Sequence, residues 1–245
     1  GTTVLGIYPH ATHEPLTVVT NKGCFRVDPL TGTTQEVHAA MGDITQADGG
    51  GSEYSQLYIL EAPTTDRNGN TTGGVLRSSD GGLTWSTCNG RLLEKTRSGF
   101  QPQFRAIGVS GHHPEVIYLS VVTPASGPGA VTEGKFEIYK SIASGNNWQL
   151  MYSANSAEVL TNNFNDSWLN RNYGPGWGGD VLTLGVAPAD PDICYATDYG
   201  QAYVTHNGGK NWHQVCSRYL TDSTYTTTGL DLTCCYGITF DPSDR

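Results

Sequence analysis

The sequence predicts an all-β fold built from repeated units of short antiparallel strands. Glycine accounts for 31 of the 245 residues and only 15% of the residues are charged, a composition typical of many tight turns between strands. Short apolar runs recur along the chain, each followed by polar turn residues. One turn pattern occurs three times at regular spacing, which indicates a repeat architecture.

Each predicted unit contains three apolar runs in a fixed order. The first runs contain a glycine and cover residues 6–9, 108–110, 185–188 and 237–242. The second runs cover residues 16–19, 56–60, 116–119 and 193–196. The third runs cover residues 24–27, 74–77, 136–139 and 202–204. Runs of this length, bounded by turn residues, are typical of strands joined by hairpins.

The recurring turn reads [ST]-x-[DN]-x-G-x-x-W and follows the third run. Its Ser/Thr and Asp/Asn side chains can accept hydrogen bonds from the turn's own backbone, and its glycine can adopt a positive φ. The tryptophan opens a fourth strand and offers a large apolar face to a neighbour. The members are Ser78, Asp80, Gly82 and Trp85; Ser141, Gly145 and Trp148, with Ala143 in place of the Asp/Asn; and Thr205, Asn207, Gly209 and Trp212. Four short strands per unit are the pattern of a β-propeller blade.

The repeats predict four blades, at about residues 1–40, 50–90, 103–154 and 180–217, and the start of a fifth at 234–245. A lone fifth strand would have unpaired edges. We therefore expect residues 1–245 to form a single propeller domain or part of one, with an incomplete ring in this chain. Further blades would lie on a continuation of the chain or on a second polypeptide.

The turn at residues 78–85 resembles an Asp-box (BNR repeat), and the turns at 141–148 and 205–212 resemble degenerate copies of it. Asp-box repeats are known from sialidases, xyloglucanase-type glycoside hydrolases and sortilin-type receptors, all of which are β-propellers. The resemblance implies a propeller of four-stranded antiparallel blades. It leaves the function open, because enzymes and binding proteins share the motif.

Charge and composition exclude several kinds of partner. The net charge of −9 argues against nucleic acid, which requires a basic surface. No stretch of about 18 apolar residues occurs, so no membrane span is predicted. No phosphate-binding loop or dinucleotide fingerprint is present, and we expect neither a cofactor nor a metal.

The cysteines indicate in which cellular compartment the protein is found. Their even number and the absence of a C-x-x-C pair favour disulfides, and therefore a secreted protein in the extracellular space or the periplasm. The alternative is six buried free thiols in a cytosolic protein. The six are Cys24, Cys88, Cys194, Cys216, Cys234 and Cys235.

Loop lengths indicate which end of the propeller is functional. The recurring turns at 78–85, 141–148 and 205–212, called the Gly-Trp turns below, lie at one end of the blades. The long connections lie at the opposite end: the hairpins at 64–73 and 123–134 and the crossovers at 38–51, 89–103, 155–180 and 218–233. The crossover at 155–180 and the turn after residue 197 are rich in aromatic and polar residues, a composition that suits stacking on sugar rings. Alternatively, Trp168 and Trp177 fill the gap between blades. The candidate glycan-binding residues are Trp168, Arg171, Tyr173, Trp177 and Tyr199.

Residues 197–203 resemble the T-D-x-G-G-x-Y segment of xyloglucanase-type hydrolases. Asp198 matches the catalytic Asp, Gly200 and Tyr203 match a glycine and the aromatic residue, and Gln201 departs from the pattern. The resemblance implies that Asp198 is a catalytic acid or base. Inverting hydrolysis needs a second carboxylate about 6.5–9.5 Å away, and no second acid lies in a matching motif. Asp198 before a glycine-containing turn is equally explained as a turn former.

Two functions follow from these observations. The first is a non-catalytic interaction or assembly propeller that engages a polysaccharide, glycan or glycan-bearing partner through its loop-rich face. The alternative is a xyloglucanase-like glycoside hydrolase that uses Asp198.

Overall fold

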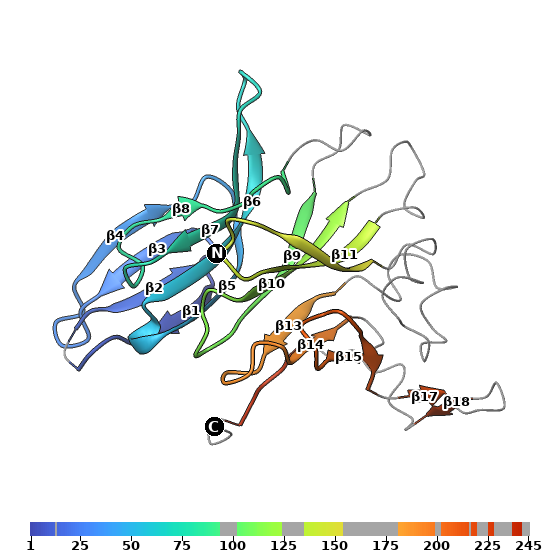
Figure 1. Ribbon diagram of the computed structural model, residues 1–245. Helices are drawn as coiled ribbons and strands as arrows, with labels where there is room; N and C mark the ends of the chain where they lie inside the picture. Colours follow the sequence, from blue (N-terminus) through green and yellow to red (C-terminus); the bar gives the residue numbers. More distant parts are fainter. Residues whose placement is uncertain are drawn as a thin grey trace.

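The computed structural model consists of four four-stranded antiparallel sheets that follow one another along the chain (Figure 1). It describes residues 1–12, 14–93, 102–123, 135–153, 181–198, 202–215, 217–219, 225–227 and 237–241. Within these residues a short 3₁₀ turn, η1 (Ser52–Tyr54), is the helical element, and no helix is long or apolar enough to span a membrane. The all-β prediction is confirmed.

Each sheet is a meander in which consecutive strands are neighbours. The first contains β1 (Val4–Tyr8), β2 (Leu16–Thr20), β3 (Gly23–Val27) and β4 (Thr34–Ala39). The second contains β5 (Ile44–Gly50), β6 (Gln56–Thr65), β7 (Thr71–Ser78) and β8 (Ser86–Thr87). The third contains β9 (Gln103–Val109), β10 (Ile117–Thr123), β11 (Lys135–Ser141) and β12 (Gln149–Ser153). The fourth contains β13 (Thr183–Val186), β14 (Cys194–Thr197), β15 (Ala202–Thr205) and β16 (His213–Gln214). A separate hairpin pairs β17 (Ser217–Tyr219) with β18 (Tyr225–Thr227).

Strand β5 corrects one expectation. Residues 44–50 were expected to belong to a crossover, and they form the first strand of the second sheet. Ile44 and Ala47 are the apolar side chains of this strand, so no apolar run marks it. Its glycines and polar residues nevertheless pair with β6 in antiparallel register from Ile44 opposite Glu61 to Gly50 opposite Gln56.

The cores lie between successive sheets, and the first strand of each sheet contacts the first strand of the next. Tyr8, Val19 and Cys24 of the first sheet pack on Leu57 and Ile59 of the second. Similar apolar clusters join the second sheet to the third and the third to the fourth. Figure 1 shows the first and fourth sheets at opposite ends of the row, so the four sheets form an open arc of propeller blades.

Each Gly-Trp turn joins the third and fourth strands of its sheet and is held by its own side chains. The Ser78 hydroxyl accepts a hydrogen bond from the Gly82 N–H at 2.7 Å, and Asp80 Oδ1 accepts from the N–H groups of Leu83 and Thr84 at 3.0 and 2.9 Å. This is the self-bonding that the sequence predicts.

The other two copies keep the hydroxyl contact. Ser141 accepts from the Gly145 N–H at 2.9 Å, and Thr205 accepts from the Gly209 N–H at 2.8 Å. Asn207 supplies the second side-chain acceptor of its turn, as Asp80 does in the first turn, whereas Ala143 has no side-chain acceptor. The central turn is therefore held by fewer side-chain bonds.

The tryptophans of two turns bind the preceding sheet. The indole N–H of Trp148 donates to the Cys88 carbonyl at 2.9 Å, and that of Trp212 donates to the Met151 carbonyl at 3.3 Å. Trp85 instead donates to Gly82 in its own turn, at 3.1 Å. Two of the three tryptophans thus connect neighbouring sheets by a hydrogen bond to a backbone carbonyl as well as by apolar contact.

Cations on the third strands also reach the next sheet. Arg26 donates to the Gly81 carbonyl at 3.0 Å and Arg77 to the Ser144 carbonyl at 3.3 Å. The buried Lys140 bonds Asp192 at 2.8 Å. These bonds hold the Gly-Trp turns of the second and third sheets, and the turn between β13 and β14 of the fourth, against the preceding sheet.

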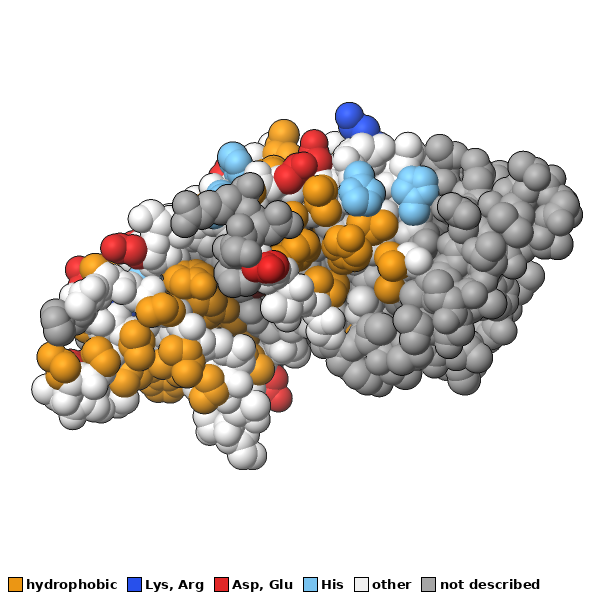
Figure 2. All heavy atoms as spheres, turned by 90° about the horizontal axis from the view of Figure 1, so that it is seen from below, with side chains coloured by type: hydrophobic (Ala, Val, Ile, Leu, Met, Phe, Trp, Pro, Cys, Tyr) orange, Lys and Arg blue, Asp and Glu red, His pale blue; other side chains and the backbone are white. Residues whose placement is uncertain are grey.

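The first sheet leaves one apolar face uncovered. Ile7 follows the glycine of β1, as Val109 and Val186 follow the glycines of β9 and β13. Val109 and Val186 are each 5% exposed, because they face the preceding sheet, whereas Ile7 is 59% exposed. Figure 2 shows hydrophobic side chains gathered at the left of the view, the side on which Figure 1 places the first sheet. A neighbour on this side would bury Ile7 as its counterparts are buried.

At the other end of the arc, residues 237–241 lie against the fourth sheet. Ile238 packs on Gly185 of β13, and the Phe240 ring meets the Tyr195 ring edge-on with centroids 6.0 Å apart. A fifth blade from this segment stays a prediction.

The disulfide prediction is wrong for three of the cysteines. Cys24, Cys88 and Cys194 are free and buried, each in a different apolar cluster, where a thiol packs as a small hydrophobic side chain. Cys216, Cys234 and Cys235 lie outside the described residues.

Candidate ligand-binding site on the loop-rich face

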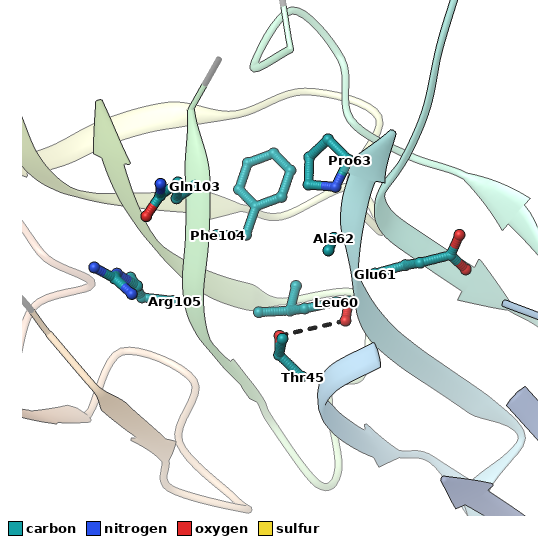
Figure 3. A pocket seen from close by; sticks show the side chains of 8 residues that line it. All are labelled: Thr45, Leu60, Glu61, Ala62, Pro63, Gln103, Phe104 and Arg105. Atoms are coloured by element: carbon teal, nitrogen blue, oxygen red, sulfur yellow. Dashed lines mark hydrogen bonds between the residues drawn. The ribbon is translucent and has the colours of Figure 1, made fainter. Parts of the chain in front are cut away.

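A pocket of about 330 Å³ opens between the second and third sheets, at the lower end of the size range of small-molecule sites (Figure 3). It lies at the β6–β7 hairpin end, opposite the Gly-Trp turns, and so on the face where the sequence predicts function. The residues that line it are Thr45, Leu60, Glu61, Ala62, Pro63, Gln103, Phe104 and Arg105.

Apolar side chains form the inside of the pocket. Phe104 projects from β9 and Pro63 from β6, and Figure 3 shows their rings on opposite sides of the space, with Leu60 and Ala62 below. Successive residues of a strand point to opposite faces. The side chains of Gln103 and Arg105 accordingly leave β9 on the side away from Phe104 and border the pocket as an exposed polar rim.

The Glu61 carboxylate points out of the pocket toward the first sheet. Its Oε2 lies 2.7 Å from His38 Nε2, and its Oε1 accepts from the N–H groups of Met41 and Gly42 at 2.9 and 3.3 Å. Burial raises the pKa of Glu61, but the hydrogen bonds from His38, Met41 and Gly42 outweigh it and hold the pKa below its usual value. This negative charge is therefore satisfied outside the pocket.

Side chains of β5 fix the strands around the pocket. The Gln46 side chain accepts from the Ile107 N–H at 3.0 Å and donates to the Leu182 carbonyl at 3.1 Å. Asp48 Oδ2 accepts from the Val109 N–H at 2.8 Å, and burial raises the pKa of this carboxyl to about 6. Side-chain bonds to backbone thus tie β5 to β9 and to Leu182, the residue before β13.

Sequence reasoning missed both the pocket and this bonding. The pocket residues come from three separate strands and form no motif. The signal that could have revealed β5 was the alternation of polar side chains at 46 and 48, which places both on one side of an inner strand.

Asp198, the predicted catalytic residue, follows β14 and is fully buried. Its Oδ2 accepts a hydrogen bond from the Tyr203 hydroxyl at 2.5 Å, across the hairpin that pairs Thr197 with Ala202. Tyr203 belongs to the apolar cluster between the third and fourth sheets. The hydrogen bond gives Asp198 a structural role in this hairpin, and its catalytic role stays a prediction.

The predicted glycan platform lies outside the described residues. This applies to all five of its members, Trp168, Arg171, Tyr173, Trp177 and Tyr199. Their role in sugar binding stays a prediction.

The sheets, their order and their packing define the chain as a β-propeller protein. No family model matches it, and no curated protein does. Among solved structures it is similar to a GH74 enzyme of Niastella koreensis, at 14% identity and a TM-score of 0.54 over 82% of this chain and 28% of that one. It is also similar to an ancestral GH74 enzyme, at 10% identity and a TM-score of 0.52 over 87% and 24% of the two chains.

A third similar structure is YCF48 from Cyanidioschyzon merolae, at 15% identity and a TM-score of 0.50 over 90% of this chain and 57% of that one. The chain thus spans about a quarter of the length of the two GH74 enzymes and just over half of YCF48. At these identities the likeness concerns the propeller fold.

Proposed function

We propose that the chain is a non-catalytic interaction module that binds a glycan, or a glycan-bearing partner, through the loop-rich face of the propeller. The pocket between the second and third sheets is the observation that supports it. Its interior of Phe104, Pro63 and Leu60 matches the apolar C–H face of a sugar ring, and its rim of Thr45 and Gln103 can bond hydroxyls.

The proposal includes a location outside the cytoplasm, where structural polysaccharides are found, and a carbohydrate platform at residues 168–177. It also includes further blades as partners, on a continuing or second chain. The exposed Ile7 face of the first sheet supports that part.

Ligand-observed NMR with soluble xyloglucan and other plant oligosaccharides tests the binding function. Saturation transfer from the protein to at least one oligosaccharide is expected, without change in the length of that oligosaccharide. Gln103→Ala should weaken the signal, while Gln35→Ala, at an exposed position of β4, should leave it unchanged. If none of the oligosaccharides shows saturation transfer, the proposal is contradicted.

A xyloglucanase-like hydrolase is the second candidate. It is supported by the T-D-x-G sequence at Asp198 and by the propeller fold shared with GH74 enzymes. Release of reducing ends from xyloglucan, lost in Asp198→Asn and retained in Asp190→Asn, at an exposed position, would favour it over the binding module. Because Asp198 is buried, the folded state of the variant must be checked by its unfolding midpoint.

A further inference from the structure

The β6–β7 hairpin projects beyond the sheet to which it belongs. Strand β5 pairs with β6 no further than Glu61, and β8 pairs with β7 no further than Leu76. The hairpin continues past both of these strands to the pair of Thr65 and Thr71, and Figure 1 shows it standing above the second sheet. Its outer part is therefore a two-stranded ribbon whose edges extend beyond the neighbouring strands of the second sheet.

The tip of this ribbon is polar, and residues 65–70 are all exposed. The Asp66 carboxylate accepts hydrogen bonds from the backbone N–H groups of Asn68 and Asn70, both at 2.8 Å. A Cβ added at Gly69, inside the turn, would meet no atom within 4 Å. The tip thus has a defined conformation with open space beside it, so a large group attached there displaces no part of the described protein.

Residues 70–72 read Asn-Thr-Thr, which matches the N-x-[ST] acceptor sequence for asparagine-linked glycosylation. Asn70 is exposed, and its Nδ2 donates one N–H to Asp66 Oδ2 at 3.0 Å. Because an amide nitrogen carries two N–H groups, a bond to a sugar can replace the second while the first is retained. The Thr72 side chain, which supplies the hydroxyl of the acceptor sequence, is also exposed. The surface of the folded hairpin therefore accommodates a sugar on Asn70.

We propose that Asn70 is a site of N-linked glycosylation. In this reaction Nδ2 attacks the anomeric carbon of a lipid-diphosphate-linked oligosaccharide, loses one proton and displaces the lipid diphosphate. The attached sugar covers the tip of the ribbon. It shields the projecting strand edges from pairing with other chains, and the peptide bond after Arg67 from proteases. The inference rests on the proposed location outside the cytoplasm and is independent of the pocket.

Peptide mapping of the protein purified from its source tests the site. An amidase that releases N-linked sugars in heavy-oxygen water converts the attached asparagine to labelled aspartate, so we expect label at residue 70. A parallel digest without the amidase corrects for spontaneous deamidation at Asn68. The position of the label separates Asn70 from the acceptor sequence at 165–167, which lies outside the described residues. No label at residue 70 in a protein found outside the cytoplasm overturns the glycosylation and leaves the location standing, whereas a protein found in the cytoplasm overturns both.

Matched variants of the 245-residue chain, secreted from eukaryotic cells, test the acceptor sequence. Thr72→Val should abolish the label at Asn70, whereas Thr72→Ser and Thr71→Val should retain it, because serine keeps the hydroxyl and residue 71 is the variable position. Label that survives Thr72→Val would contradict the proposal. Removal of the sugar from the unmodified chain should speed trypsin cleavage after Arg67 in the folded protein. Equal cleavage rates with and without the sugar would overturn its shielding role.

Discussion

Replacing Asp48 by asparagine should stabilise the protein at neutral pH. The Asp48 carboxylate accepts hydrogen bonds from the backbone N–H groups of Val109 and Gly49, both at 2.8 Å. These two bonds end on different carboxylate oxygens, so the single side-chain oxygen of asparagine can accept one of them, and the uncharged amide resembles the protonated carboxyl group. Burial raises the pKa of Asp48 from 3.8 to about 6, so the folded state disfavours the ionised form despite these bonds.

The size of the effect follows from this difference in pKa. One pKa unit corresponds to about 1.4 kcal/mol, so full ionisation costs the folded state about 3 kcal/mol. Because the Asp48 side chain is partly exposed, we expect Asp48→Asn to raise the free energy of unfolding by about 1 to 3 kcal/mol at pH 7.5. Because the pKa of Asp48 is higher in the folded than in the unfolded state, the protonated side chain contributes to the free energy of unfolding. This contribution is fully present below pH 3.8 and is lost as the pH rises through 6.

Urea unfolding of the two proteins between pH 4 and pH 8 measures this difference directly. The variant should gain stability over the unmodified chain as the pH rises, and the two should converge at pH 4. Asp43→Asn is the control, because Asp43 is exposed and directly precedes β5. A stability difference that does not depend on pH, or a variant less stable at pH 7.5, would refute the assigned cost of the charge.

Three further predictions test the packing. Gly209→Ala, at φ +90° with a Cβ 2.8 Å from Met151, should lower the free energy of unfolding by about 1 to 3 kcal/mol, and more than Gly69→Ala, which meets no atom within 4 Å. Equal losses in urea unfolding would show that contact with the neighbouring sheet is irrelevant. Ile7→Ser should cost less than about 1 kcal/mol and Val109→Ser about 2 to 3, since only the second side chain is buried; a large loss for Ile7→Ser in this chain would mean that its face is covered. The three described cysteine thiols, whose pKa values burial raises, should resist alkylation until the protein unfolds, and peptide mapping that finds them modified in the folded state would disprove their burial.

The fold could be predicted because its signals are local and repeated. Each Gly-Trp turn specifies its own conformation through a hydroxyl and a glycine, as Ser78 and Gly82 show. A pattern that depends on residues close in sequence is visible without knowledge of the fold. The strands on either side of these turns could therefore be located by their distance from the turns.

Strand β5 and the free state of the cysteines were harder to predict, because contacts between residues far apart in sequence determine both. Gln46 and Asp48 bond the backbone of a sheet some 60 residues further on, at Ile107 and Val109, which no local pattern encodes. An even number of cysteines is compatible with disulfides and with separate burial. At Cys24 the packing against Val19 and Leu57 decides the outcome.

The pocket was unpredictable for a related reason. Its lining combines the start of β5, the end of β6 and the start of β9, three segments that become neighbours only when two sheets pack. Asp198 was found by a motif, but a motif does not report exposure. Its burial against Tyr203 comes from the packing of the fourth sheet on the third.

The same bonds that hold the second and third sheets together also define the pocket between them. Gln46 and Asp48 fix β5 to β9 a few residues from Thr45 and Phe104, so a change in the spacing of the sheets changes the width of the pocket. A ligand that binds in a pocket of this width stabilises the folded protein by an amount that depends on its concentration relative to its Kd. Burial raises the pKa of Asp48 to about 6, so near that pH protonation removes a charged acceptor from this interface without touching the ligand. Ligand affinity and the stability of the interface are therefore linked, and both should depend on pH over the range in which Asp48 titrates.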